Sequence, residues 1–134
     1  MHSVRSQSRS RPEDLVQHLA GRPEILFAML YGSAAEGGTF RDLDVGIMLD
    51  RARVPASSDL DYVLALGENL QRALQFPVDV RALNDAPLPF RYNVSRGIPL
   101  VVHDSEAWFA FRERTWDEYM DFQPVAMAYL REMA

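Results

Sequence analysis

The sequence predicts a single α/β (α+β) domain built from four short strands and flanking helices. Three observations lead to this fold class. Four apolar runs, each bounded by glycine, proline or small polar residues, have the length and composition of strands. Longer segments repeat apolar residues at helical spacing. The 134 residues, 48% of them hydrophobic, suffice for one closed core and leave no room for a second domain.

The N-terminal segment differs in composition from the rest of the chain. Residues 1–12 consist mainly of serine and arginine, so we expect a flexible basic tail in front of a single domain at 13–134. Such a tail could contact an acidic partner, but a leader without a specific role is the simpler interpretation. A short helix is predicted from Pro12 to about Ala20, and Gly21 ends it.

The first two predicted strands are joined by a loop of small residues. Residues 25–31 suit a buried strand, which Gly32-Ser33 stops abruptly, and residues 42–49 form the second run. A glycine-rich loop at this point has little side-chain bulk. A phosphate group could therefore approach its backbone closely.

The remaining elements follow from periodicity and from breaking residues. A helix is predicted from an N-cap at 57–59, with an apolar face that then packs on the sheet, and Pro77 starts a third strand at 78–83. The apolar face of this helix is expected to comprise Leu60, Val63, Leu64, Gly67, Leu70 and Leu74.

The C-terminal half is expected to add a short helix, an edge strand and a long aromatic helix. Residues 84–93 read as a loop entering a helix that Gly97 ends, and Pro99 favours an edge position for the strand at 98–102. The last helix starts near Ser105, and Pro124 should kink or interrupt it. Its Trp, Tyr and Met residues are expected to be partly core and partly a partner interface.

Three carboxylates make the strongest functional signal. Asp42 and Asp44 stand two residues apart in a predicted strand, so both should point to one face and repel each other. A divalent cation relieves such repulsion, and Mg²⁺ prefers carboxylates together with substrate phosphates. Asp79, in another strand, supplies a third carboxylate. We predict that these three residues hold the metal and act in catalysis, and that Gly32 and Ser33 bind the nucleotide.

Composition excludes several other classes of protein. The formal net charge of −5 and a pI near 5.1 argue against a general nucleic-acid binder, which would carry a basic surface. Without cysteine there is neither a disulfide nor a zinc–thiolate site. No apolar run is long enough to span a membrane, and the polar start does not suit a signal peptide. A cytoplasmic location is expected.

These motifs resemble those of the nucleotidyltransferase superfamily, whose pattern is a Gly-Ser turn, an Asp-x-Asp strand and a later single Asp. The residues are Gly32-Ser33, Asp42-Leu43-Asp44 and Asp79. The chain is most similar to the minimal, single-domain branch, the MNT domains. The resemblance extends from about residue 25 to the C-terminus through the stretches 83–87, 96–100 and 119–124. It implies a small mixed sheet in a nucleotidyltransferase-like fold.

The resemblance also implies a biological role. Proteins of this branch are antitoxins that pair with HEPN-domain ribonuclease toxins, and some transfer AMP from ATP to a toxin tyrosine with magnesium. By this resemblance the protein is a magnesium-dependent adenylyltransferase whose partners are ATP and a HEPN toxin. Asp79 would also be placed to accept the proton of the acceptor hydroxyl.

A second interpretation is a non-catalytic antitoxin that neutralises its partner by complex formation. The interval between Ser33 and Asp42 is shorter than in the common pattern of the family. Glu36, within that interval, would repel a phosphate instead of binding it. Under this interpretation the C-terminal helix covers the toxin and the nucleotide site is inactive.

Overall fold

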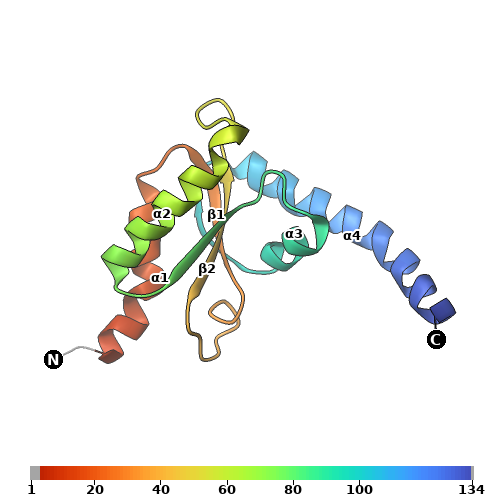
Figure 1. The fold of residues 1–134 in the computed structure, drawn as a ribbon, viewed down its shortest axis with the longest axis horizontal. Helices are drawn as coiled ribbons and strands as arrows, with labels where there is room; N and C mark the ends of the chain where they lie inside the picture. The colour runs from red at the N-terminus through yellow and green to blue at the C-terminus, as the bar shows by residue number, and fades with distance from the viewer. Residues whose placement is uncertain (1–3, 134) are drawn as a thin grey trace.

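A four-stranded sheet forms the middle layer of the protein and is covered by helices on both faces (Figure 1). The structure is a computed structural model that describes residues 4–133, with side chains described from residue 12 onwards. The elements in chain order are α1 Val4–Ala20, β1 Ile25–Tyr31, β2 Leu43–Leu49, a 3₁₀ turn Ala56–Ser58, α2 Asp59–Leu74, β3 Val78–Ala82, α3 Leu88–Ser95, β4 Ile98–Val102 and α4 Ser105–Met133. The predicted α/β class is confirmed.

The sheet is mixed, with strand order β3-β2-β1-β4. Strand β1 pairs antiparallel with both β2 and β4, whereas β2 and β3 are parallel. The four predicted strands are confirmed to within one residue at their ends. Strand β4 lies at an edge, as Pro99 suggested, because a residue without an N–H is best tolerated there.

Each face of the sheet has its own apolar core, because neighbouring residues of a strand point to opposite faces. One core lies under α1 and α2 and contains Leu15, Leu19, Ala28, Leu30, Val45, Ile47, Leu66 and Leu70. The other lies under α3 and α4 and contains Phe27, Met29, Tyr31, Leu83, Val94 and Phe111. Strand β1 therefore contributes to both cores and is almost completely buried.

Helix α1 is longer than predicted. It begins at Val4, whereas the expected start was Pro12, which lies inside the helix. The buried side chains of Leu15 and Leu19 anchor α1, and extending an anchored helix costs much less than nucleating one. Residues 1–3 of the predicted tail lie outside the described residues, and the domain boundary at residue 13 stays a prediction.

Helix α2 buries most of the predicted face, but the buried face is rotated away from Leu60 and Leu64 toward Leu66. Leu60 and Leu64 are 67% and 60% exposed, whereas Leu66 is buried together with Gly67, Leu70 and Leu74. Two overlapping apolar stripes run along this helix, and the packing against β3 selects the one that includes Leu66. The predicted N-cap region lies at the helix start, but Ser58 makes no side-chain capping hydrogen bond.

Helix α4 is attached to the domain through its first half. Tyr119 stacks on Tyr92 of α3 with ring centroids 3.7 Å apart, and the Trp116 indole N–H donates to the Ser95 hydroxyl at 2.9 Å. Arg91 forms an ion pair with Glu118 at 2.7 Å. These contacts lie between residues 116 and 119, and the C-terminal part of the helix beyond them projects from the body (Figure 1).

The predicted interruption at Pro124 is wrong, because α4 is continuous from Ser105 to Met133. Residues 120–125 and 127–133 are exposed, so the backbone carbonyl that loses its partner at Pro124 can be hydrated. The C-terminal aromatic and methionine side chains are thus not core. No helix in the part of the chain that the structure describes is long and apolar enough to cross a membrane.

Candidate nucleotide-binding site

The predicted site residues gather at one end of the sheet, on the face covered by α3 and α4. In the strand register Tyr31 lies opposite Asp44, and Asp44 lies opposite Asp79. The three side chains therefore form one row across β1, β2 and β3. The parallel pairing of β2 with β3 is what brings Asp44 and Asp79 together, although they are far apart in the sequence.

Asp42 lies in the bend immediately before β2, so the strand begins one residue later than predicted. It is nevertheless close enough to affect its neighbour. The pKa of Asp44 is raised above its ordinary value, first by partial burial and then by the negative charges of Asp42 and Asp79, while Arg81 opposes the shift. The structure thus gathers three acids whose charges are only partly compensated.

Two residues at this site were not expected from the sequence. Arg81 follows Asp79 by two positions on β3 and pairs with it at 3.2 Å, although both side chains are about half exposed and the pair is correspondingly weak. Tyr31 is buried, and its pKa is raised by that burial and by the charge of Asp44. The i, i+2 spacing of Asp79 and Arg81 in a strand was the available signal for Arg81.

The Gly32-Ser33 turn lies directly against Asp44. Gly32 has φ +78°, a conformation that favours glycine, and a Cβ at this position would lie 2.6 Å from Asp44 Oδ2. The Gly32 carbonyl accepts hydrogen bonds from the backbone N–H groups of Ala35 and Glu36 at 3.1 and 3.2 Å. Ser33 and Glu36 are exposed. The predicted loop and the predicted acids are therefore adjacent.

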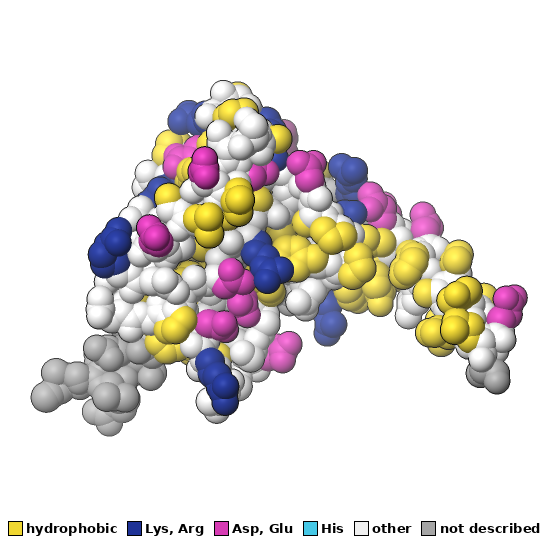
Figure 2. Space-filling view, viewed as in Figure 1, with side chains coloured by type: hydrophobic (Ala, Val, Ile, Leu, Met, Phe, Trp, Pro, Cys, Tyr) yellow, Lys and Arg dark blue, Asp and Glu magenta, His cyan; other side chains and the backbone are white. Residues whose placement is uncertain are grey.

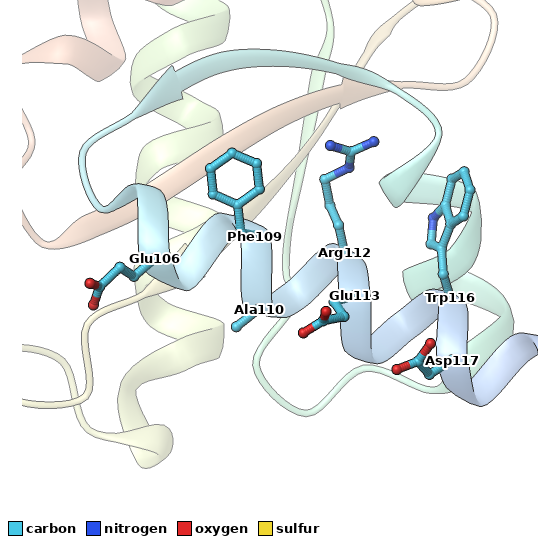
Figure 3. A pocket seen from close by; sticks show the side chains of 7 residues that line it. All are labelled: Glu106, Phe109, Ala110, Arg112, Glu113, Trp116 and Asp117. Carbon is cyan, nitrogen blue, oxygen red and sulfur yellow. The ribbon is translucent and has the colours of Figure 1, made fainter.

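The predicted site lies at one end of the sheet, and its side chains do not surround a position for a metal ion. In the described part of the chain, no three acidic or histidine side chains are arranged closely enough to hold a metal ion. Four of the best-formed hollows are lined by residues other than the five predicted ones. A hollow of about 640 Å³ lies along α4 and is lined by residues of that helix alone (Figure 3).

Comparison with protein families identifies the family to which this domain, with its row of Tyr31, Asp44 and Asp79, belongs. Residues 13–106 match the family described as polymerase beta, nucleotidyltransferase. The chain belongs to this nucleotidyltransferase family. The match includes all five predicted site residues and ends as α4 begins. No sequence among the curated proteins matches the chain significantly.

Solved structures with the nucleotidyltransferase fold cover nearly the whole chain. A chain of the toxin–antitoxin complex MntA–HepT superposes with a TM-score of 0.68 at 19% identity, over 94% of this chain and 99% of that one. A complex from Shewanella oneidensis, a tri-AMPylated HEPN toxin with an MNT antitoxin, gives 0.69 at 19% identity over 95% and 99%. A toxin–antitoxin structure with AMP-PNP gives 0.71 at 21% identity over 92% and 98%.

A divalent cation fits the residues that this nucleotidyltransferase presents. The candidate ligands are carboxylates, which hard cations such as Mg²⁺ prefer. Partial burial and, after it, the negative charges of Asp42 and Asp79 raise the pKa of Asp44, and a bound cation would favour its charged form. Asp42, Asp44 and Asp79 are the residues that would hold such a cation, and this assignment stays a prediction.

We predict that Gly32→Ala weakens both the fold and nucleotide binding. The added methyl group strains the left-handed backbone and collides with the Asp44 carboxylate, and such strain costs on the order of 1–3 kcal/mol. Thermal melting and titration with a nucleotide measure the two effects. Gly37→Ala is the matched control, since Gly37 has φ +83° but nothing within 4 Å of its Cβ position. Equal nucleotide affinity in both variants would contradict the placement of Gly32 at the site.

We also predict that Asp44→Asn stabilises the protein at neutral pH in the absence of divalent cations. Because folding raises the pKa of Asp44, the folded state holds this proton more tightly than the unfolded state. Stability is therefore lost as the pH rises through the raised pKa, and is unaffected below the ordinary pKa. Melting temperatures measured from pH 3 to pH 7 with a chelator should diverge as pH rises, with the variant higher. If the melting temperatures of the two proteins differed by the same amount at every pH, Asp44 would not have a raised pKa in the folded state.

Proposed function

We propose that the protein is an antitoxin that transfers AMP from ATP to a tyrosine hydroxyl of a partner HEPN toxin, with magnesium as cofactor. The observation that carries this proposal is the row formed by Asp44 and Asp79 beside the Gly32 turn. Family membership supports nucleotidyl transfer. The AMPylated toxin and the AMP-PNP complex among the structural neighbours support AMP as the transferred group and a HEPN toxin as the acceptor.

The proposed reaction is an attack of the tyrosine hydroxyl oxygen on the α-phosphorus of ATP. A new O–P bond forms, the bond between the α-phosphorus and the bridging oxygen to the β-phosphate breaks, and pyrophosphate leaves. The bound cation would supply neutralisation of the phosphate charge. Asp42, Asp44 and Asp79 would hold this cation against the triphosphate, and the backbone of Gly32 and Ser33 would orient the β and γ phosphates. Asp79 would also accept the proton of the attacking hydroxyl.

The experiment uses two forms of labelled ATP. The protein is incubated with magnesium and a purified HEPN-domain protein from the same genome, with ATP labelled at either the α- or the γ-phosphate. Only the α-label should pass to the toxin, and replacing the acceptor tyrosine by phenylalanine should prevent it. Transfer of the γ-label would instead mean phosphorylation and would exclude the proposed chemistry.

The second candidate function is neutralisation by binding alone. It is favoured by Glu36, which lies exposed in the turn after Gly32 where it would repel a phosphate. It is also favoured by the exposed apolar side chains on the free half of α4. If the protein formed a tight complex with the toxin but transferred neither label, neutralisation by binding would replace AMP transfer as the proposed function.

A further inference from the structure

Helix α4 carries a row of exposed apolar side chains outside both apolar cores, and one member, Trp116, also donates a hydrogen bond to Ser95 of α3. These side chains recur at intervals of seven, four, seven and three residues, so they share one face of the helix. Their exposed fractions run from 45% to 65%, and Figure 2 shows apolar side chains along the projecting end. We call this row the α4 seam: Phe109, Trp116, Met120, Met127 and Leu130.

An acidic row runs beside the first half of the seam. In Figure 3 the side chains of Glu106, Glu113 and Asp117 leave the helix on one side of the groove, while Phe109 and Trp116 leave it on the other. Within the described chain these three acids form no ion pair with any base.

The basic residue that lines the groove, Arg112, forms no ion pair with these acids within the described chain. The guanidinium of Arg112 is stacked over the Trp108 ring at 4.8 Å and lies 6.0 Å from the Trp116 ring. A partner could therefore bury the apolar side chains of the seam and also supply positive charge to the unpaired acids beside it.

The position of the seam separates it from the nucleotide site. The match to the nucleotidyltransferase family ends at residue 106, so the seam lies entirely outside it. The seam lies on α4, whereas Asp44 and Asp79 lie on β2 and β3, and the hollow between the seam and the row of Glu106, Glu113 and Asp117 is lined by α4 alone. A large apolar surface on a projecting helix is costly to leave in water unless a partner covers it.

We propose that the α4 seam docks an amphipathic helix of a partner protein, one that carries Lys or Arg along the edge facing Glu106, Glu113 and Asp117. A helix is the expected occupant because the seam follows the near-seven-residue repeat of paired helices. The inference does not depend on nucleotide transfer.

Other occupants fit the charges less well. A second copy packed in parallel would set Glu113 against Glu113, and an antiparallel copy would offer the acidic row a segment, 117–134, whose only Lys or Arg is Arg131. A lipid surface or a nucleic acid is anionic and would be repelled by the same acids. A basic amphipathic helix satisfies both the apolar and the charged part of the surface.

Two designed helical peptides test the proposal on the full chain. Both are about 25 residues long, with Leu on one face; one carries Lys along the flanking edges and the other Glu. Binding is measured by fluorescence anisotropy at low and high salt. We expect the Lys-edged peptide to bind at least about tenfold more tightly, with an advantage that shrinks as salt is added.

The variants separate the apolar and charged parts of the surface. Met120→Glu with Met127→Glu should weaken the Lys-edged peptide about tenfold or more. The matched control, Leu60→Glu with Leu64→Glu, changes two side chains on α2 that are at least half exposed, as Met120 and Met127 are, and should have no effect. Glu113→Lys with Asp117→Lys should reverse the preference between the peptides. Circular dichroism melting confirms that each variant is folded.

Three results would overturn the inference. The first is failure of the chain to bind either peptide, and the second is equal binding of both. The third is a dimer, seen by sedimentation, that Met120→Glu with Met127→Glu dissociates, because a second copy would then occupy the seam. A chain that binds the Lys-edged peptide but transfers no AMP would refute only the proposed function, and AMP transfer without peptide binding would refute only the docking site.

Discussion

Asp44→Asn is expected to reduce AMP transfer to the HEPN partner by about a thousandfold or more while leaving the protein folded. Asp44 is the central member of the row, between Tyr31 of β1 and Asp79 of β3, and it lies against the Gly32 turn. An asparagine keeps the shape of the side chain but removes the charge that would hold a divalent cation and its triphosphate. Losing one electrostatic contact to a transferring group commonly costs a hundred- to a thousandfold, and losing a metal ligand as well costs more.

The control for this prediction is Asp61→Asn. Asp61 is an exposed acid on α2 with no ion pair in the described chain, so its removal changes the net charge equally without touching the row. Transfer rates are measured with α-labelled ATP, and calorimetry with ATP and magnesium reports binding. If Asp44→Asn retained the activity of Asp61→Asn, the assignment of the site to this row would be wrong.

Gly97→Ala is expected to destabilise the protein by on the order of 3 kcal/mol or more, and the variant can fail to accumulate in folded form. A Cβ at this position would lie 2.1 Å from the Leu30 carbonyl oxygen and 3.2 Å from that of Val94. Both are backbone atoms, and Leu30 belongs to the buried central strand β1, so neither can move aside like a flexible side chain. Overpacking that shifts backbone typically costs 1–3 kcal/mol and sometimes more, which is a large part of the 5–15 kcal/mol that stabilises a domain.

Urea unfolding of Gly97→Ala and Gly21→Ala measures this effect directly. Gly21 also follows the end of a helix, but nothing lies within 4 Å of its Cβ position, so its replacement should change the midpoint little. If both variants unfolded at the same urea concentration, the close approach of Gly97, in the turn between α3 and β4, to β1 would not be a determinant of stability.

The strands were predictable because their signals are local. The run at 25–31 is uninterrupted by polar residues and is stopped by Gly32, and the run at 98–102 contains Pro99, which only an edge strand accommodates easily. Composition and breaking residues determine such elements without reference to the rest of the fold. The pattern of Gly32-Ser33 with Asp42 and Asp44 was likewise readable because it lies within one loop and one strand.

The faces that the helices bury were less predictable. In α2 the apolar residues form two overlapping stripes, and only the docking on β3 determines that Leu66 is buried and Leu64 is not. In α4 the sequence indicated an interruption at Pro124, but the helix continues, because its end projects into water where a broken hydrogen bond costs little. The spacing of apolar residues predicts that a segment is helical. Which side chains of that helix are buried depends on residues far away in the chain.

The sequence by itself determined the α/β class, the four strands and the residue types of the candidate site. The tertiary structure decided which of these residues meet. Asp79 lies beside Asp44 because β2 and β3 pair in parallel, and Arg81 and Tyr31 enter the site through the same register. Gly97 is required by the contact with Leu30 as well as by the helix end. Pairing between distant segments depends on the energy of the whole sheet and both cores, and no local pattern of residues contains that information.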